Sequence, residues 1–193
     1  MGRPPKAYVL GSLIELESCI TLKHSRCWNS KAKLSTSREL GVGLGQITKA
    51  FNSNGTIRFD ALTELKIKHS KELRELTWSN IETRPELQIR AVILKNRDNF
   101  HYYKSSSETV LDALHFADAA YNGGVGGLDR ERRACKISPS CNHKKWFDNV
   151  EKYCMKSKTI LYGNRSACDI NRHHVYEVFL VRANKYKTAW VRI

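Results

Sequence analysis

The sequence predicts a mainly α-helical fold, with at most a minor β component, in a single domain. Apolar residues recur at helical spacing in several stretches, and capping residues or glycines stand at the ends of these stretches. Of the 193 residues, 41% are hydrophobic and 27% charged, which is typical of a soluble globular protein with a buried core. We expect one domain over residues 1–193, with the main motifs within about 9–124 and a cysteine-containing elaboration and closing helix within about 125–193.

The first predicted helix, Val9–Thr21, carries two acidic residues in different surroundings. At helical spacing, Glu17 lies beside apolar residues such as Leu13 and Ile20. Glu15 has small or polar residues at the same offsets and is expected to be solvated. Because a carboxyl group held against aliphatic side chains is harder to ionise, Glu17 is the candidate proton donor. The alternative is that Glu17 reaches out to water from the edge of the apolar stripe.

A polar, basic loop is predicted over Lys23–Ser37. Its single Trp28 could stack on a sugar or a base, or could pack on the core. Three glycines then occur in five residues, over Gly41–Gly45, followed by Gln46. This segment lacks the pattern of a phosphate loop or a dinucleotide fingerprint. Gln46 suits hydrogen bonding to hydroxyl or acetamido groups, and the alternative is a structural turn before a helix.

Further helices are predicted along the middle of the chain. Leucines at helical spacing predict an amphipathic helix over Asp60–Thr77, after a turn in residues 52–56. Pro85 suits the first turn of a buried helix. The residues 105–108 are expected to open the next helix, which brings Tyr121 to its end on the core-facing side. Asn122 and the two glycines after it end that helix.

The last third of the chain is basic and rich in cysteine. Residues 130–166 are expected to form short helices and loops held by cysteines, followed by a helix or a strand that begins near Asn171. Six cysteines, an even number, are compatible with disulfides formed in an oxidising compartment. A zinc site with nearby histidines and reduced structural thiols are the two alternatives.

The charge balance predicts an anionic partner. Lysine and arginine number 33 against 19 acidic residues, a formal net charge of +14. The basic residues are spread along the chain without a nucleic-acid motif, so we expect no specific nucleic acid and a basic surface suited to an anionic cell envelope. No apolar run is long enough to cross a bilayer, and the N-terminus is a poor signal peptide.

Three motifs in a fixed order carry a resemblance to a known family. They are Glu17-Ser18 on a helix, the segment Gly43-Leu44-Gly45-Gln46, and residues 120–124, Ala-Tyr-Asn-Gly-Gly, at a helix end. This order resembles the soluble lytic transglycosylases, lysozyme-like enzymes that cleave the glycan of bacterial peptidoglycan. In that family a methionine usually stands where this chain has Gly45. Residues 171–175 resemble the closing helix of the family, which favours a helix over a strand there.

The resemblance implies a lysozyme-like fold with an active-site cleft and a single catalytic carboxyl group. Glu17 would be the general acid and then the base, and Tyr121 would orient its carboxylate. The implied substrate-binding residues are Ser18, Gly43, Leu44, Gln46, Tyr121 and Asn122. No cofactor and no metal are implied.

The expected activity is cleavage of the β-1,4 bond between N-acetylmuramic acid and N-acetylglucosamine, with a 1,6-anhydro product. Between Glu17 and Gln46 the only other acid is Glu39, and a single-acid mechanism needs no second carboxylate. We therefore expect a monomeric, disulfide-containing bacteriophage endolysin that acts on peptidoglycan strands. It would be made in the host cytoplasm and work in the periplasm on the cell wall. The alternatives are a hydrolytic muramidase, a non-enzymatic wall-binding module and a zinc-containing nucleic-acid binder.

Overall fold

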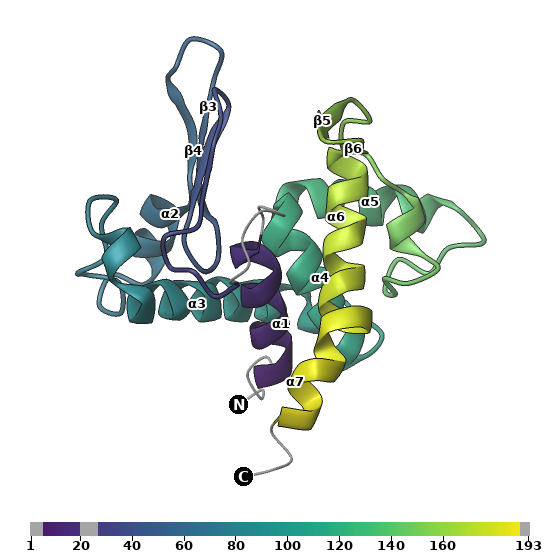
Figure 1. Ribbon diagram of the computed structural model, residues 1–193. Helices are drawn as coiled ribbons and strands as arrows, with labels where there is room; N and C mark the ends of the chain where they lie inside the picture. The colour runs from purple at the N-terminus through teal and green to yellow at the C-terminus, as the bar shows by residue number, and fades with distance from the viewer. Residues whose placement is uncertain (1–5, 20–26, 190–193) are drawn as a thin grey trace. The chain divides into compact units, whose positions relative to one another are not determined.

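The structure is a computed structural model that describes residues 6–19 and 27–189, and it has an α+β fold. The chain forms two compact units, one of residues 7–95 and one that runs from Asn96 onward. The division falls within helix α3 (Pro85–Lys104), the long teal helix of Figure 1. Each unit is described separately below. In the part of the chain that the structure describes, no helix has the length and apolar character needed to span a membrane.

The unit 7–95 begins with helix α1 (Ala7–Ser18). The predicted helix is therefore confirmed over residues 9–18, whereas Ile20 and Thr21 lie outside the described residues. A four-stranded antiparallel sheet follows, in the order β1 (Lys33–Ser35), β2 (Glu39–Val42), β3 (Ile47–Phe51), β4 (Ile57–Asp60). In Figure 1, β3 and β4 form a long hairpin.

The sheet corrects two predictions. The end of the predicted loop, residues 33–35, is strand β1, and the glycine segment precedes strand β3, not a helix. The strands have only three to five residues, and β2 contains Gly41, which has low strand propensity. The predicted turn over residues 52–56 is confirmed as the link between β3 and β4.

The core of this unit lies between the sheet and helices α2 (Ala61–Lys68), η1 (Ile81–Thr83) and the first half of α3. Its buried cluster consists of Val42, Ile47, Ala61, Leu62, Leu65, Leu73, Leu76, Ile81, Leu87, Ala91 and Leu94. The predicted helix Asp60–Thr77 was too long, because α2 ends at Lys68. The ammonium of Lys66 donates hydrogen bonds to the carbonyl oxygens of Arg74 and Leu76, which stabilises the returning chain.

The second unit is mainly helical. Its elements are the second half of α3, α4 (Val110–Gly123), α5 (Val125–Ile137), η2 (Val150–Lys152), β5 (Ile160–Tyr162), β6 (Arg165–Ser166), α6 (Ala167–Tyr176), the π-helical segment η3 (Glu177–Arg182) and α7 (Ala183–Ala189). Helix α4 contacts both α5 and α6. The helical interpretation of residues 171–175 is confirmed by α6, which begins with a Ser166–Asp169 capping box.

Helix α4 begins later than predicted. Its N-cap is Thr109, whose side chain accepts a hydrogen bond from the backbone amide of Asp112. The hydroxyl groups of Ser106 and Ser107 instead donate to the carbonyl oxygen of Tyr103, near the end of α3. The serines therefore complete the previous helix and do not cap the next one.

The six cysteines form three disulfides, which confirms the disulfide prediction. The pairs are Cys19–Cys27, Cys135–Cys141 and Cys154–Cys168. Each pair closes a short segment, with sequence separations of 8, 6 and 14 residues. Because every cysteine is paired, no thiolate is left as a ligand for the zinc site that was one alternative.

Candidate active site

Glu17 lies in the last turn of α1 and is 9% exposed. Glu15, two residues earlier, is also buried, so its predicted solvation was wrong. The reason is that α1 is buried over most of its circumference, including Gly11 and Ser12 on the face that carries Glu15. Burial therefore does not distinguish the two carboxyl groups, and the difference between them lies in their neighbours.

A cation lies near Glu17. Burial lowers the pKa of Lys95 on α3, and attraction to the carboxylates of Glu17 and Glu64 opposes this shift. The surroundings of Glu17 thus contain an ammonium group as well as the aliphatic side chains that the sequence predicted. Such a cation offsets part of the cost of burying a neighbouring carboxylate.

The end of α1 is joined to the following chain by two short links. The Ser18 hydroxyl donates to the carbonyl oxygen of Ile14 at 2.7 Å and accepts from the backbone amide of Trp28 at 2.8 Å. The Cys19–Cys27 disulfide forms the second link. Ser18 is therefore already hydrogen bonded within the protein, while the side chain of Trp28 is 44% exposed, next to this helix end.

The turn between β2 and β3 is formed by Gly43–Gln46. Gly43 has a φ of 82° and its amide donates to the carbonyl oxygen of Ala32 at 2.7 Å. The side-chain amide of Gln46 donates to the carbonyl oxygens of Ala32 and Gly43, both at 3.1 Å. Its carbonyl oxygen Oε1 is buried and has no hydrogen-bond partner among the described residues. Gln46 therefore stabilises the turn and retains one unused acceptor.

Gln88 of α3 was missed by the sequence analysis. Its Oε1 accepts from the amide of Leu44 at 2.8 Å, and its Nε2 donates to the carbonyl oxygens of Ser30 and Ile81. The side chain is fully buried against the glycine turn. The signal in the sequence was the position of Gln88 itself, a polar residue three positions before Ala91 on a helix face that is otherwise apolar.

In the second unit, Tyr121 is buried at the end of α4, as the helical spacing predicted. The Asn122 side chain is held by Asn171 of α6, whose Nδ2 donates to Asn122 Oδ1 at 3.1 Å and to the carbonyl oxygen of Ala119 at 2.9 Å. A Cβ on Gly123 would meet the side chains of Lys156 and Asn171. The helix end that carries the third motif is therefore closely packed against α6 and the segment before β5.

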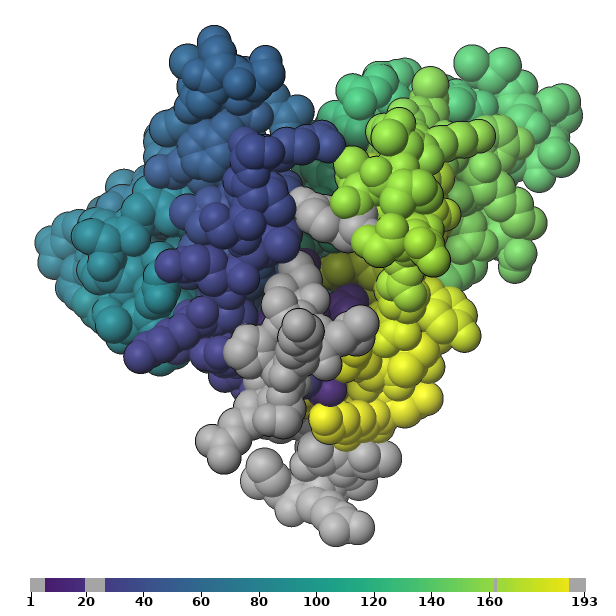
Figure 2. Space-filling model, turned by 45° about the horizontal axis from the view of Figure 1, so that its top comes forward, coloured from purple at the N-terminus to yellow at the C-terminus, as the bar shows by residue number. Residues whose placement is uncertain are grey.

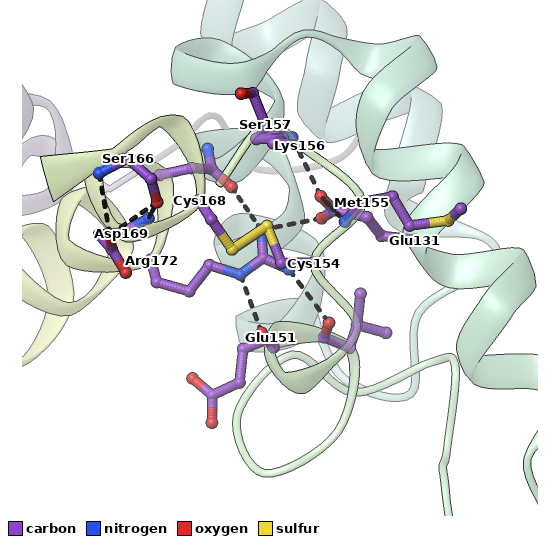
Figure 3. The surroundings of a disulfide bond; sticks show 12 residues. Glu131, Glu151, Cys154, Met155, Lys156, Ser157, Ser166, Cys168, Asp169 and Arg172 are labelled. Carbon is purple, nitrogen blue, oxygen red and sulfur yellow. Dashed lines mark hydrogen bonds and ion pairs between the residues drawn. A yellow bond between two sulfur atoms is a disulfide. The ribbon is translucent and has the colours of Figure 1, made fainter. Parts of the chain in front are cut away.

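Glu131 of α5 anchors that segment (Figure 3). Its buried carboxylate forms ion pairs with Lys156 at 3.2 Å and Arg172 at 2.9 Å, and it accepts from the backbone amide of Met155. The adjacent Cys154–Cys168 disulfide joins the same segment to α6. One carboxylate and one disulfide thus position Lys156 beside Gly123.

A second buried polar pair joins α4 to α6. Asp118 Oδ2 lies 2.9 Å from His174 Nδ1, and both side chains are buried. His174 stands where the resembled family usually has tyrosine. The contact therefore holds α6 against the second half of α4.

The structure thus places the predicted residues in two groups. Glu17, Ser18, Gly43, Leu44 and Gln46 belong to the unit 7–95, and Tyr121 and Asn122 to the second unit. Among residues 6–19 and 27–189, no three side chains of the metal-binding types gather into a candidate metal site. Comparison with family models, curated proteins and solved structures finds no match for this chain.

Proposed function

We propose that the protein is a peptidoglycan lytic transglycosylase in which Glu17 is the single general acid and base. The observation that carries the proposal is the burial of Glu17 at the end of α1, in a motif order that resembles this enzyme family. A buried carboxyl group within reach of a cation is suited to exchange a proton in both directions. The roles of Tyr121 and Asn122 in the proposal rest on the resemblance alone.

The reaction proceeds in two proton transfers. Glu17 first donates its proton to the glycosidic oxygen, and the acetamido oxygen of N-acetylmuramic acid attacks C1 as the C1–O bond breaks. The Glu17 carboxylate then takes the proton of the C6 hydroxyl group of the same sugar, and O6 displaces the acetamido oxygen from C1. Glu17 ends protonated, as it began, and no water is consumed. Lys95 stabilises the carboxylate form between the two steps.

The single-acid mechanism in the proposal follows the family resemblance. Within residues 7–95, four acidic side chains are engaged in a helix cap or in ion pairs, namely Asp60, Glu75, Glu82 and Glu86. A hydrolytic muramidase of the usual type needs a second carboxylate across the scissile bond. In that alternative we test Glu39, which is half-buried in β2 and is the acid between Glu17 and Gln46 in the sequence.

The net charge of +14 and the three disulfides support action outside the cytoplasm. A basic surface favours encounter with an anionic envelope, and disulfides persist in oxidising compartments. We therefore propose that the protein acts on the cell wall. We expect it to be a bacteriophage endolysin that acts on a Gram-negative host.

The deciding experiment is mass spectrometry of peptidoglycan digested with the protein. Transglycosylation gives muropeptides that end in 1,6-anhydro-N-acetylmuramic acid, which are lighter by one water than the hydrolytic products. Anhydro ends are the expected result. Reducing N-acetylmuramic acid ends would show that the protein is a hydrolytic muramidase. Intact glycan together with binding to the wall would show that it is a non-enzymatic binding module.

A further inference from the structure

The free end of the sheet carries a groove with a distinctive set of side chains. The turn between β1 and β2, residues 36–38, and the turn between β3 and β4, residues 52–56, lie at the end of the sheet opposite to Gly43–Gln46. The groove between them has a volume of about 490 Å³. Its lining consists of Ser37, Arg38, Phe51, Asn52, Ser53 and Arg58. Figure 2 shows this end of the sheet, in blue, at the surface of the molecule.

The walls of the groove are held by backbone and side-chain hydrogen bonds. The amide of Phe51 donates to the carbonyl oxygen of Arg38 at 2.8 Å, which joins the two turns across β2 and β3. Asn52 bonds Thr56 through both its backbone and its side chain, at 2.8 and 2.9 Å. The groove is therefore shaped before any ligand arrives.

A change of register aims one of the two arginines. Ala50 pairs with Phe59 and Phe51 pairs with Ile57, so Arg58 is the extra residue on β4 and has no partner across the ladder. Bulges of this kind re-aim a side chain and are common at functional sites. Here the extra residue is a cation that lines the groove.

The groove is unbalanced in charge. Both arginines are exposed, and among the described residues neither Arg38 nor Arg58 forms an ion pair with a carboxylate. No acidic residue belongs to the lining. Arg84 of the same unit, in contrast, pairs with both Glu75 and Glu86. Two uncompensated guanidinium groups beside hydroxyl and amide groups form a receptor for planar anions, above all carboxylates.

We propose that this groove binds the free carboxylates of the peptide stems of peptidoglycan, an inference that rests on the proposed function. The half-buried ring of Phe51 provides an apolar wall for the carbon chain of the stem, and the arginines bind its acidic groups. Strand β2 of four residues spans about 13 Å between the groove and the Gly43–Gln46 turn. An extended stem of four residues spans the same distance, about 13 Å, so a glycan strand near that turn brings its stem to the groove.

The test is isothermal titration calorimetry, which measures the binding of a soluble disaccharide-tetrapeptide to the full chain. The variant Arg38→Gln/Arg58→Gln removes both cations from the groove, and Lys68→Gln/Lys71→Gln removes two exposed cations elsewhere in the same unit. We expect the groove variant to bind about tenfold or more weakly, because charge-assisted hydrogen bonds are lost. The lysine variant should bind as the wild type does.

Two further ligands identify the chemistry that is recognised. The disaccharide without its peptide should bind the wild type and the groove variant equally. Inorganic phosphate at the same ionic strength should not displace the disaccharide-tetrapeptide. Equal binding of the disaccharide-tetrapeptide by the groove variant, or displacement by phosphate, would overturn the proposal.

The catalytic proposal and the groove proposal fail separately. Wild-type protein that binds the disaccharide-tetrapeptide through the arginines but leaves glycan strands intact would contradict transglycosylation and keep the groove. Protein that releases anhydro-muropeptides at the same rate from strands with and without peptide stems would keep the catalytic proposal and exclude the groove.

Discussion

The Gln88 side chain accepts a hydrogen bond from the backbone amide of Leu44 at 2.8 Å, and this bond ties α3 to the turn between β2 and β3. The Nε2 group of the same side chain donates hydrogen bonds to the carbonyl oxygens of Ser30 and Ile81. Gln88 thus satisfies three backbone groups of three different segments in a buried place. The glycine turn, which our proposal assigns to substrate binding, is held in place by a side chain of helix α3.

Gly43→Ala should destabilise the unit 7–95 strongly. Gly43 has a φ of 82°, and an added Cβ would collide with the Gln88 side chain. Gly55→Ala is the matched control, because Gly55 has a φ of 80° but open space around the position of a Cβ. We expect about 1 kcal/mol for the control and about 2–4 kcal/mol for Gly43→Ala. Urea denaturation measures both, and equal losses would show that the Gln88 contact is unimportant.

Glu17→Gln should abolish release of muropeptides, with a loss of at least about a thousandfold, because the variant can neither donate nor accept the required proton. Glu15→Gln is the matched control, since both residues are buried in α1 and both changes replace a carboxyl group by an amide. Turbidity clearance of purified peptidoglycan measures the activity, and thermal melting checks the fold. Activity lost in Glu15→Gln and retained in Glu17→Gln would reverse the assignment.

Glu39→Gln separates the two enzymatic mechanisms. If Glu17 acts alone, this variant should retain its activity within about a factor of three and give the same anhydro products. A hydrolase that uses Glu39 as its second carboxylate would lose about a hundredfold or more. Chromatography of the muropeptides from wild type and variant, at equal protein concentration, gives the answer.

The sequence predicted the helices that carry the acidic and tyrosine motifs, because their apolar spacing and glycine stops are local signals. It did not predict the sheet. Strands of three to five residues, one of which contains Gly41, are stabilised by pairing and by packing on α2, and neither is visible in a local pattern. The leucines in Asp60–Thr77 recur at helical spacing, which predicted one long helix. Leu73 and Leu76 are indeed buried, but they lie in the non-helical chain after the end of α2.

The candidate site was only partly predictable for the same reason. Glu17, Gln46 and Tyr121 were found because they stand in short motifs, whereas their supports come from distant segments. Gln88 acts 44 residues from its partner Leu44, and Asn171 acts 49 residues from Asn122. The burial of Glu15 was missed because residues such as Gly11 and Ser12 look like a solvated face, although small residues also allow close packing.

Glu131→Gln should destabilise the second unit. The change removes the negative charge between two cations, Lys156 and Arg172, which lie 3.2 and 2.9 Å from the carboxylate. Burial already lowers the pKa of Lys156, and Glu131 opposes that shift. We expect a loss of about 3–5 kcal/mol.

The control for this prediction is Glu108→Gln, which removes the exposed ion pair with Lys145 and should cost much less stability than Glu131→Gln. A second change, Lys156→Met, should recover part of the stability of Glu131→Gln, because it removes one of the two unbalanced cations. Chemical denaturation measures all of these variants. Additive losses in the double variant would contradict the network.

His115 should make the stability of the protein depend on pH below neutrality. The ring is buried between Phe147 and Phe179, at centroid distances of 4.7 and 4.5 Å. Burial lowers the pKa of His115 to about 4, and attraction to Asp112 opposes this shift. In the unfolded chain the imidazole has an ordinary pKa of about 6.5. Between these two values the unfolded state binds a proton that the folded state does not.

The free energy of unfolding should therefore be fully retained above about pH 6.5, fall as the pH is lowered towards about 4, and lose no more through this residue below that. The full change is about 3 kcal/mol. His115→Leu removes the titration, so the difference in stability between wild type and variant should shrink by this amount at low pH. Urea denaturation from pH 7 to 4 measures it. A constant difference over that range would mean that the pKa of His115 is the same in the folded and the unfolded protein.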